Sequence, residues 1–239
     1  MTTLPTRVSR GQGPHRLYLI LLTTLVLLLT AGLVVALQHR GDDATVGVQG
    51  SGMESTQTRQ LPSFTSVDLA GANVVTVHVG DKQAVVVHAD DNLLQFITTD
   101  VRDGQLVIAN TGTFTARSPM RVDVTVPKFD AATLSGAGVM TVEAVKAEKF
   151  VARLPGTGVL HVSGTVGSLD ATLDGTGDLQ LQNLISRDAT VAVAGSGRLQ
   201  VNATGTLDAS VSGSGAIFYA GSPTNVTRSV TGSGAITAQ

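Results

Sequence analysis

One stretch of the chain reads Leu154-Pro155-Gly156-Thr157-Gly158-Val159-Leu160-His161-Val162. Its Gly-x-Gly pair occurs six times in the second half of the sequence, and successive pairs begin 20, 19, 20, 18 and 19 residues apart. The paired glycines are Gly136 and Gly138, Gly156 and Gly158, Gly175 and Gly177, Gly195 and Gly197, Gly213 and Gly215, and Gly232 and Gly234. Self-similarity at a fixed period of this length is the signature of a repeat architecture.

The residues on both sides of each glycine pair also align. Two positions before the first glycine the chain has an apolar residue: Leu134, Leu154, Leu173, Val193, Val211 or Val230. After each pair, two further residues of the same kind alternate with polar ones: Met140/Val142, Leu160/Val162, Leu179/Leu181, Leu199/Val201, Ile217/Tyr219 and Ile236/Ala238. The alternation also runs backward through Ala152, Ala171, Val191 and Ala209, with Arg228 as the exception. A period of two predicts strands that bury one face.

Each repeat holds only two or three short strands, so it cannot bury its apolar face alone. Stacked coils about 4.8 Å apart join these faces into one interior. A left-handed solenoid normally shows a strict six-residue period, which this sequence lacks, so we predict a right-handed parallel β-helix (β-solenoid). An antiparallel sandwich is the alternative, because its strand spacing of about 8–12 residues also fits the alternation. Six aligned glycine corners favour the solenoid.

The glycines have two expected roles at these corners. Glycine adopts a positive φ without strain, and it lets neighbouring coils approach closely. An earlier stretch, Gly71-Ala72-Asn73, is a degenerate corner with Asn in place of the second glycine, and Asn tolerates positive φ better than most residues. A phosphate cradle would need a helix after the loop, whereas every pair here runs into another strand.

The first half of the chain predicts further strands. Val75–Val79 and Ala84–His88 flank the turn Gly80–Gln83, which is typical of a β-hairpin. The other elements expected here are a turn and strand at 100–108, a half-buried strand at 120–126 that ends at Pro127, and a short helical turn at 91–96.

The N-terminal region predicts a membrane span. Leu17–Leu37 contains 21 residues without a charge, and a helix of this length spans about 30 Å, the thickness of a hydrocarbon core. The preceding cations are Arg7, Arg10 and Arg16, and the positive-inside rule therefore puts the N-terminus in the cytoplasm. The alternative is a cleaved signal peptide and a secreted domain, since Val34-Val35-Ala36 resembles a cleavage site. The expected organisation is a cytoplasmic tail (1–16), a single-pass signal anchor (17–37), a linker (38–60) and a solenoid domain (61–239).

Composition excludes several classes of site. The 239 residues include no Cys, so disulfides, thiolate zinc sites, iron–sulfur clusters and a lipid-modified N-terminal Cys are excluded. After Arg16 there are 13 basic against 18 acidic residues, which gives no electrostatic footprint for nucleic acid. His78 and His88 flank the predicted hairpin, but no third ligand stands at metal spacing, so solvated strand histidines are expected. We expect no cofactor and no metal.

Two acids of the repeats have nearly the spacing of the carboxylate pair of a glycosidase. Asp170 and Asp208 both stand five residues before a first corner glycine, two coils apart, or about 9–10 Å. An inverting glycosidase separates its carboxyl groups by about 6.5–9.5 Å. However, Thr190 separates the pair, and the chain has no Trp to stack a sugar. The corner serines are turn residues without a nucleophile elbow. We therefore predict no catalytic residue, and a polysaccharide-degrading enzyme is the third hypothesis for function.

Several segments, in order, resemble the head GIN domain of bacterial auto-transporter adhesins, from about Pro62 to the C-terminus. They are Phe64–Val79 with its Gly71-Ala72-Asn73, Ala89–Leu94, Asp103–Ile108, Val122–Pro127, Leu134–Gly138 and the later Gly-Ser-Gly corners. The resemblance implies a β-helical domain that is displayed in the cell envelope and acts in adhesion, with no catalytic residues to carry over. This chain lacks the lipoprotein Cys of many such domains and has a helix anchor instead. That difference implies an inner membrane facing the periplasm, or the surface of a cell with one membrane.

We therefore expect a non-catalytic binding or adhesion module for envelope or surface glycans or proteins. Its candidate binding face is an outward polar stripe with two acids beside it: Thr172, Thr190 (or Ala192), Ser210 and Ser229, with Asp170 and Asp208. A structural or sensory scaffold that forms homo-oligomers is the alternative. Its candidate docking edge is the terminal rung, Ile236–Gln239.

Overall fold

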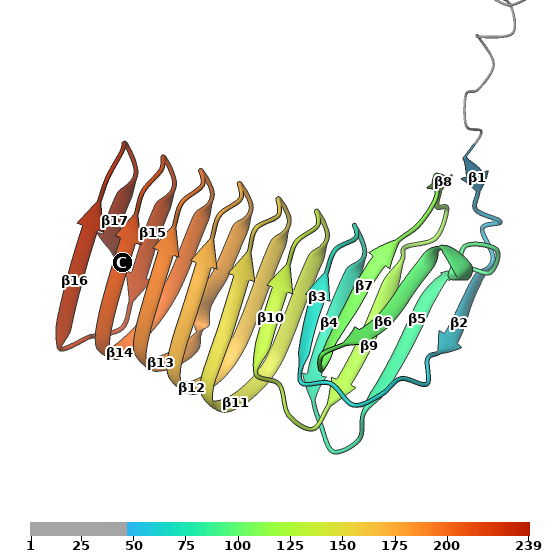
Figure 1. The fold of residues 1–239 in the computed structure, drawn as a ribbon, viewed down its shortest axis with the longest axis horizontal. Coiled ribbons are helices and arrows are strands. Elements are labelled where there is room, and N and C mark those ends of the chain that lie inside the picture. Colours follow the sequence, from blue (N-terminus) through green and yellow to red (C-terminus); the bar gives the residue numbers. More distant parts are fainter. Residues whose placement is uncertain (1–46) are drawn as a thin grey trace, which may run out of the picture. The chain divides into compact units, whose positions relative to one another are not determined.

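The computed structural model describes residues 47–239, so the predicted tail and membrane anchor lie outside the described residues. Within residues 47–239, no helix is both long and apolar enough to cross a membrane. The second half of the chain consists of strands separated by the glycine corners (Figure 1). They are β10 (Ala131–Leu134), β11 (Val139–Leu154), β12 (Val159–Leu173), β13 (Asp178–Val193), β14 (Arg198–Val211), β15 (Ala216–Ala220), β16 (Asn225–Val230) and β17 (Ala235–Ala238).

Each of these strands pairs in parallel with the equivalent strand of the next coil. Met140 lies opposite Leu160, and Leu160 lies opposite Leu179. Residues that align in the sequence repeat are therefore neighbours in adjacent coils. The parallel register continues from β14 to β15 and β16, and from β15 to β17. The β-solenoid is confirmed, and the antiparallel sandwich is wrong for the repeat region.

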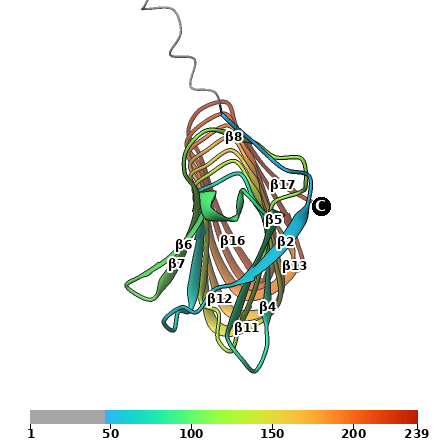
Figure 2. The ribbon, with the colours of Figure 1, turned by 90° about the vertical axis from the view of Figure 1, so that its right-hand side faces the viewer.

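Two sheets face each other across the coil (Figure 2). The first sheet contains β3 (Ser66–Leu69), β7 (Gln105–Asn110), β10, the C-terminal halves of β11–β14, and β16. The second sheet contains β4 (Val74–Val79), β9 (Arg121–Val126), the N-terminal halves of β11–β14, β15 and β17. Each coil therefore contributes one strand segment to each sheet.

The inward side chains of both sheets form one hydrophobic core. On the second sheet, the column Met140, Leu160, Leu179, Leu199 and Ile217 is fully buried. The facing column on the first sheet is buried as well: Leu134, Leu154, Leu173, Val193 and Val211. Burial of one such side chain contributes about 1.5–3 kcal/mol. Alternation also places Tyr219 inside, whereas Phe218 is half-buried on the outer surface.

Close approach of backbones explains the corner glycines, and positive φ does not. Of the twelve, only Gly232 has a positive φ, so that part of the expectation is wrong. A Cβ added to Gly156 would instead lie 2.1 Å from the carbonyl oxygen of Gly136, one coil earlier. At Gly158 the same distance, to the oxygen of Gly138, is 2.1 Å. Each corner can therefore pack against the preceding one only because it has no side chain there.

Asn73, which takes the place of the second glycine in the degenerate corner, does not have a positive φ either. Its corner is the first of the stack, so it meets the end of β7 rather than another glycine corner. The buried Asn73 Oδ1 accepts a hydrogen bond from Asn110 Nδ2 at 3.1 Å, and Asn110 Oδ1 accepts one from the backbone N–H of Ala72 at 3.1 Å. Asn can replace glycine here because its side chain fills the place of a preceding corner.

The opposite edge of the coil is made by β-bulges inside the long strands. The register between β11 and β12 shifts between Val142 and Val145, and β13 is bulged opposite β14 between Leu181 and Ile185. A bulge bends a strand sharply, which lets one continuous strand pass from the second sheet to the first.

Ala144 adopts a left-handed conformation in the first of these bulges, with φ of 58°. This conformation costs a non-glycine residue about 1–2 kcal/mol. Glycine would avoid that cost, but it would also increase the conformational entropy of the unfolded chain, which offsets part of the gain. We expect Ala144→Gly to raise the free energy of unfolding by up to about 1 kcal/mol, measured by urea denaturation. A lower urea midpoint would show that the bulge does not strain the backbone.

The predicted hairpin at 75–88 is wrong. β4 and β5 (Ala84–Asp90) do not pair with each other, because β9 lies between them, parallel to β4 and antiparallel to β5. Val122 of β9 is opposite Val75 on one side and Val87 on the other. All three strands alternate, so the local turn signal could not indicate which strand pairs with which. The turn within 100–108 is confirmed as the hairpin of β6 (Ile97–Arg102) and β7, and the helical turn as the 3₁₀ helix η1 (Leu94–Phe96).

The predicted linker is wrong over part of its length. Within it, β1 (Val48–Gln49) pairs with β8 (Phe114–Thr115), and β2 (Glu54–Thr58) pairs antiparallel with β5. β2 has no apolar residue, so periodicity could not detect it; its backbone adds to the sheet edge. Figure 2 shows β2 and η1 across the near end of the coil, where Leu93 and Ile97 are buried. The N-terminal end of the core is thereby covered.

The C-terminal coil is different, because every residue of β16 is exposed. Val226 and Val230 are 38% and 48% exposed, although they stand in inward columns. Arg228 stands opposite Ala209, and its guanidinium lies 4.9 Å from the ring centre of Tyr219 and donates a hydrogen bond to the Tyr219 hydroxyl. Arg228, which stands where the other coils have Ala or Val, therefore covers this end of the core with a charged group.

Candidate functional site

The predicted binding face lies on the outer surface of the first sheet. Thr172, Ala192, Ser210 and Ser229 stand opposite one another in successive coils. Thr190 belongs to the neighbouring column, so Ala192 is the correct alternative at that point of the stripe. The six predicted residues share one face, but they form two columns.

Asp170 and Asp208 are in the second of these columns, two coils apart, and both are opposite Thr190. The rung spacing separates them by about 9–10 Å. Thr190 occupies the position between the two carboxylates, where an inverting glycosidase would hold its water. Within residues 47–239, no group of three His, Asp or Glu side chains could hold a metal ion.

His78 and His88 each have a carboxylate partner from another strand. His78 Nδ1 lies 3.1 Å from Glu143 Oε2, and His88 Nε2 lies 3.0 Å from Asp123 Oδ2. Both carboxylates are distant in sequence from the histidines, because β9 and β11 supply them. A single carboxylate with each histidine still falls short of a metal site.

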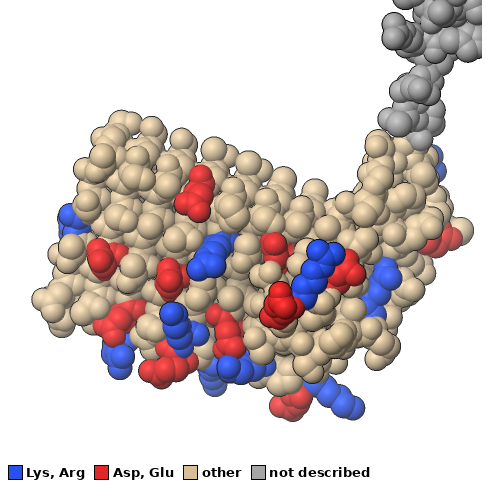
Figure 3. Space-filling model, viewed as in Figure 1, with Lys and Arg blue, Asp and Glu red and all other residues tan. Residues whose placement is uncertain are grey.

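Charge is distributed unevenly over the solenoid. Figure 3 shows Lys, Arg, Asp and Glu side chains mainly over the lower half of the face in view, away from the edge that carries the glycine corners. Asp174 is the one charged residue in the six repeated corners. The bulged edge is therefore a mixed-charge surface, and the glycine edge is a nearly neutral one.

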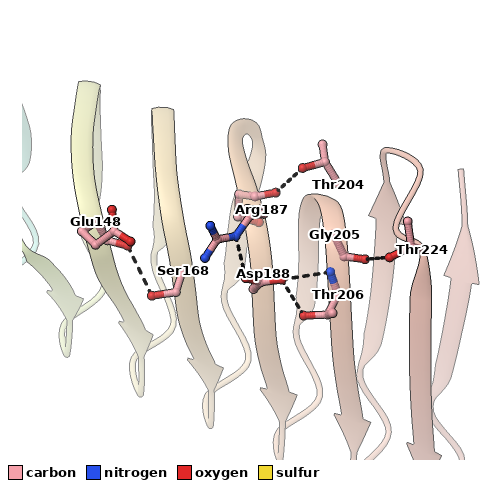
Figure 4. Close-up of polar contacts among 9 residues, drawn as sticks. Glu148, Ser168, Arg187, Asp188, Thr204, Gly205, Thr206 and Thr224 are labelled. Carbon is pink, nitrogen blue, oxygen red and sulfur yellow. Dashed lines mark hydrogen bonds and ion pairs between the residues drawn. The ribbon is translucent and has the colours of Figure 1, made fainter.

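Polar groups at the bulged edge bind one coil to the next (Figure 4). Ser168 Oγ donates to the carbonyl oxygen of Glu148, and Thr224 Oγ1 donates to that of Gly205. Thr206 Oγ1 donates to Asp188 Oδ1 at 2.8 Å. These hydroxyl groups are already used by neighbouring coils, so they have little capacity left for a ligand.

Asp188 also forms a charge-assisted hydrogen bond at this edge. Its Oδ2 accepts from Arg187 Nε at 2.8 Å. The hydrogen bond from Arg187, followed by those from Thr206, lowers the pKa of the Asp188 carboxyl below its ordinary value. The pair is satisfied within the protein, which favours a structural role over ligand binding.

A groove of about 420 Å³ follows the glycine edge on the side of the second sheet. Four coils build it, so it is about 14 Å long. Each coil contributes the middle residue of its corner, the second corner glycine and the first residue of the next strand: Thr157-Gly158-Val159, Thr176-Gly177-Asp178, Ser196-Gly197-Arg198 and Ser214-Gly215-Ala216. A strip of bare glycine backbone therefore separates a column of hydroxyl groups from a column of strand side chains.

The hydroxyl groups of this groove, unlike those at the bulged edge, are available. No side-chain hydrogen bond among residues 47–239 involves Thr157, Thr176 or Ser196, and Ser214 accepts one only from Ser233. Phe218 completes the lining at one end, and the Arg198 guanidinium lies over its ring, 5.6 Å from the centroid.

Asp178 and Arg198 stand opposite each other in adjacent coils, yet they form no ion pair. Asp178 Oδ2 accepts from Gln180 Nε2 at 2.9 Å, whereas Asp178 Oδ1 is buried and has no partner in the described part of the chain. A buried polar atom without a partner is unusual in a native protein. The groove thus holds an unused acceptor beside an unused donor.

This groove was missed at the level of sequence. Serine and threonine at a corner are explained as turn residues, and an acid or a cation at the start of a strand has no partner nearby in the sequence. A signal was present, because the corner residues Thr157, Thr176, Ser196, Ser214 and Ser233 are all hydroxyl-bearing and the next strand begins with Asp178 and Arg198.

The architecture and the order of the segments agree with a known family. Residues 63–223 match the model of the family described as "Putative auto-transporter adhesin, head GIN domain". The chain belongs to this family. No curated protein matches it.

Solved structures share the fold of this head GIN domain. One is a putative adhesin from Bacteroides fragilis, with a TM-score of 0.69 and 22% identity over 81% of this chain and 100% of that one. A putative lipid binding protein from Parabacteroides distasonis has a TM-score of 0.54 and 19% identity over 80% of this chain and 99% of that one. A putative adhesin from the same organism has a TM-score of 0.52 and 20% identity over 81% and 100% of the two chains. At these identities the likeness concerns the fold alone.

Proposed function

We propose that this head GIN protein is a non-catalytic binding module of the bacterial cell envelope. It holds surface or envelope glycans or proteins on the outer surface of its solenoid. The observation that carries this function is the in-register stacking of outward residues, which places mainly polar side chains in columns along successive coils. Such an array suits an elongated ligand better than a single small molecule.

The segment at 17–37 anchors the module in the cytoplasmic membrane, with the solenoid in the periplasm or outside the cell. Its apolar length and the preceding arginines support this topology. Cleavage after the segment would release a secreted form, and the mass of the mature protein distinguishes the two.

Residues 47–239 form a compact unit with its own core, so a fragment of these residues is suitable for a binding test. The fragment is applied to arrays of envelope glycans and envelope proteins, and the same glycans are assayed for cleavage. Binding without cleavage is the expected result. Cleavage of any glycan would overturn the non-catalytic assignment, and failure to bind either class would overturn the module itself.

Self-association through the C-terminal coil is a second function, favoured by the exposed Val226 and Val230. Arg228 opposes it, because two copies meeting end to end would bring their guanidinium groups together. We expect Arg228→Val to extend the apolar column and to tighten self-association at least about tenfold. Sedimentation of the fragment at several concentrations measures this. An unchanged association state would eliminate this coil as a docking end.

A further inference from the structure

We propose that the groove along the glycine edge binds a linear oligosaccharide through adjacent hydroxyl groups of one sugar, held between Asp178 and Arg198. This inference rests on the proposed binding function and names its site and ligand class. It moves the site from the predicted face of the first sheet to the opposite sheet.

The first argument is the complementarity of the two charged groups. Asp178 Oδ1 is an acceptor without a donor, and the Arg198 guanidinium is a donor with no hydrogen bond or ion pair among residues 47–239. Their strands are adjacent, so the groups stand one coil apart. Once the carboxylate turns about its Cβ–Cγ bond to present the buried Oδ1 to the groove, two neighbouring hydroxyls of a pyranose supply what both groups lack. One hydroxyl donates to the carboxylate, and the other accepts from the guanidinium.

The second argument is the position of Phe218. Its ring contacts the guanidinium of Arg198 by a cation–π interaction, and this contact holds the guanidinium beside the groove. Arg198 therefore does not depend on Asp178 for its position, and its N–H groups stay available to a ligand.

The third argument is the direction and chemistry of the hydroxyl column. Thr157, Thr176 and Ser196 run parallel to the groove at one hydroxyl for each coil, and each hydroxyl can both donate and accept. Only an elongated ligand that is itself rich in hydroxyl groups can use the whole column. A ligand lying across the coils would meet one hydroxyl.

An extended peptide fits the same groove less well. Strand addition needs a free backbone edge, but the backbones beside the groove already pair with the coils on both sides, from Val159 through Asp178 and Arg198 to Ala216. The groove also offers no series of apolar pockets for alternate side chains. The observations therefore favour a glycan over a protein.

The experiment is calorimetric titration of the full chain with short linear oligosaccharides. The probes are β-1,4-linked glucose and mannose chains, whose internal sugars have adjacent free hydroxyls, and a β-1,4-linked N-acetylglucosamine chain, whose internal sugars do not. We expect binding of a diol-containing chain and its loss when periodate has cleaved the diols. Asp178→Asn and Arg198→Met should each weaken this binding by about ten- to a hundred-fold.

Matched controls use the first sheet. Asp100→Asn and Arg102→Met remove the same charges from exposed positions of β6, at the edge of that sheet, and should leave binding unchanged; thermal melts verify that all four variants fold. If the controls weaken oligosaccharide binding and the groove variants do not, the groove assignment fails while the binding function stands. If the protein array alone gives a ligand, the glycan assignment fails. If neither sugars nor proteins bind, the proposed function fails with it.

Discussion

Gly175→Ala is expected to destabilise the solenoid by about 3 kcal/mol or more, in a chain where an ordinary surface substitution would cost little. A Cβ on Gly175 would lie 1.8 Å from the carbonyl oxygen of Gly156 in the preceding coil. That oxygen belongs to the backbone and cannot rotate away as the end of a flexible side chain could. The coils must separate at this corner, and the parallel ladder between β12 and β13 extends from it in both directions. Urea denaturation of the fragment 47–239 measures the loss.

Gly104→Ala is the matched control, because it separates the two reasons for a glycine. Gly104 has φ of 75° in the turn between β6 and β7, and nothing lies within 4 Å of a Cβ added there. The substitution therefore carries only the conformational cost, about 1–2 kcal/mol. If Gly104→Ala proved as damaging as Gly175→Ala, close approach of the coils would not be the reason for the corner glycines.

The same contrast shows what the repeat can and cannot predict. The period of Gly-x-Gly pairs and the alternating columns were sufficient for the stacked coil, because every coil repeats the same demands on each position. The prediction that the corner glycines need a positive φ is wrong, whereas the prediction that they allow close approach of the coils is confirmed. Sequence could not separate the two, because glycine meets both requirements. Asn73 could have distinguished them, as it occupies the one corner that has no other corner before it.

Prediction failed where one strand enters between two others. A turn sequence typical of a hairpin separates the strands that contain Val75 and Val87. Both residues nevertheless pair with Val122 of β9, more than thirty residues further along the chain. Only long-range packing selects this arrangement, and it leaves no local trace. The sequence did not predict β2 for a different reason. This edge strand has no apolar residues and joins the sheet through its backbone alone, so it shows no hydrophobic alternation.

The candidate groove shows the same limit at the level of a site. Asp178 and Arg198 are 20 residues apart, and each alone is an unremarkable charged residue at the start of a strand. Their proximity follows from the register of β13 and β14, and the missing partner of Asp178 Oδ1 follows from burial. Sequence could have suggested the column of corner hydroxyls, since it recurs with the period, but not which hydroxyls the fold leaves free.

Asp90→Asn is expected to loosen the segment 47–58, which contains β1 and β2, from the N-terminal end of the solenoid that it covers. The Asp90 side chain is inaccessible to solvent and accepts hydrogen bonds from the backbone N–H groups of Arg117 at 2.8 Å and Gly52 at 3.0 Å, and from Ser118 Oγ at 2.7 Å. An amide has one acceptor oxygen where the carboxylate has two, so some donors lose their partner. Hydrogen exchange at Gly52 and Arg117 should accelerate more than about tenfold.

The same contacts predict how stability depends on pH. The hydrogen bond from Arg117, and then that from Ser118, lowers the pKa of Asp90 below its ordinary value of 3.8. A carboxyl whose folded pKa is lowered stabilises the protein above its unfolded-state pKa, and this contribution is lost as pH falls through the folded pKa. Denaturation midpoints of the wild-type protein should therefore fall as the pH is lowered from about 5 into this range, and those of Asp90→Asn should fall less steeply. Asp81→Asn makes the same charge change in the exposed loop after β4 and should keep the wild-type slope. An acid dependence that survives in Asp90→Asn and disappears in Asp81→Asn would show that the N-terminal segment is not held by Asp90.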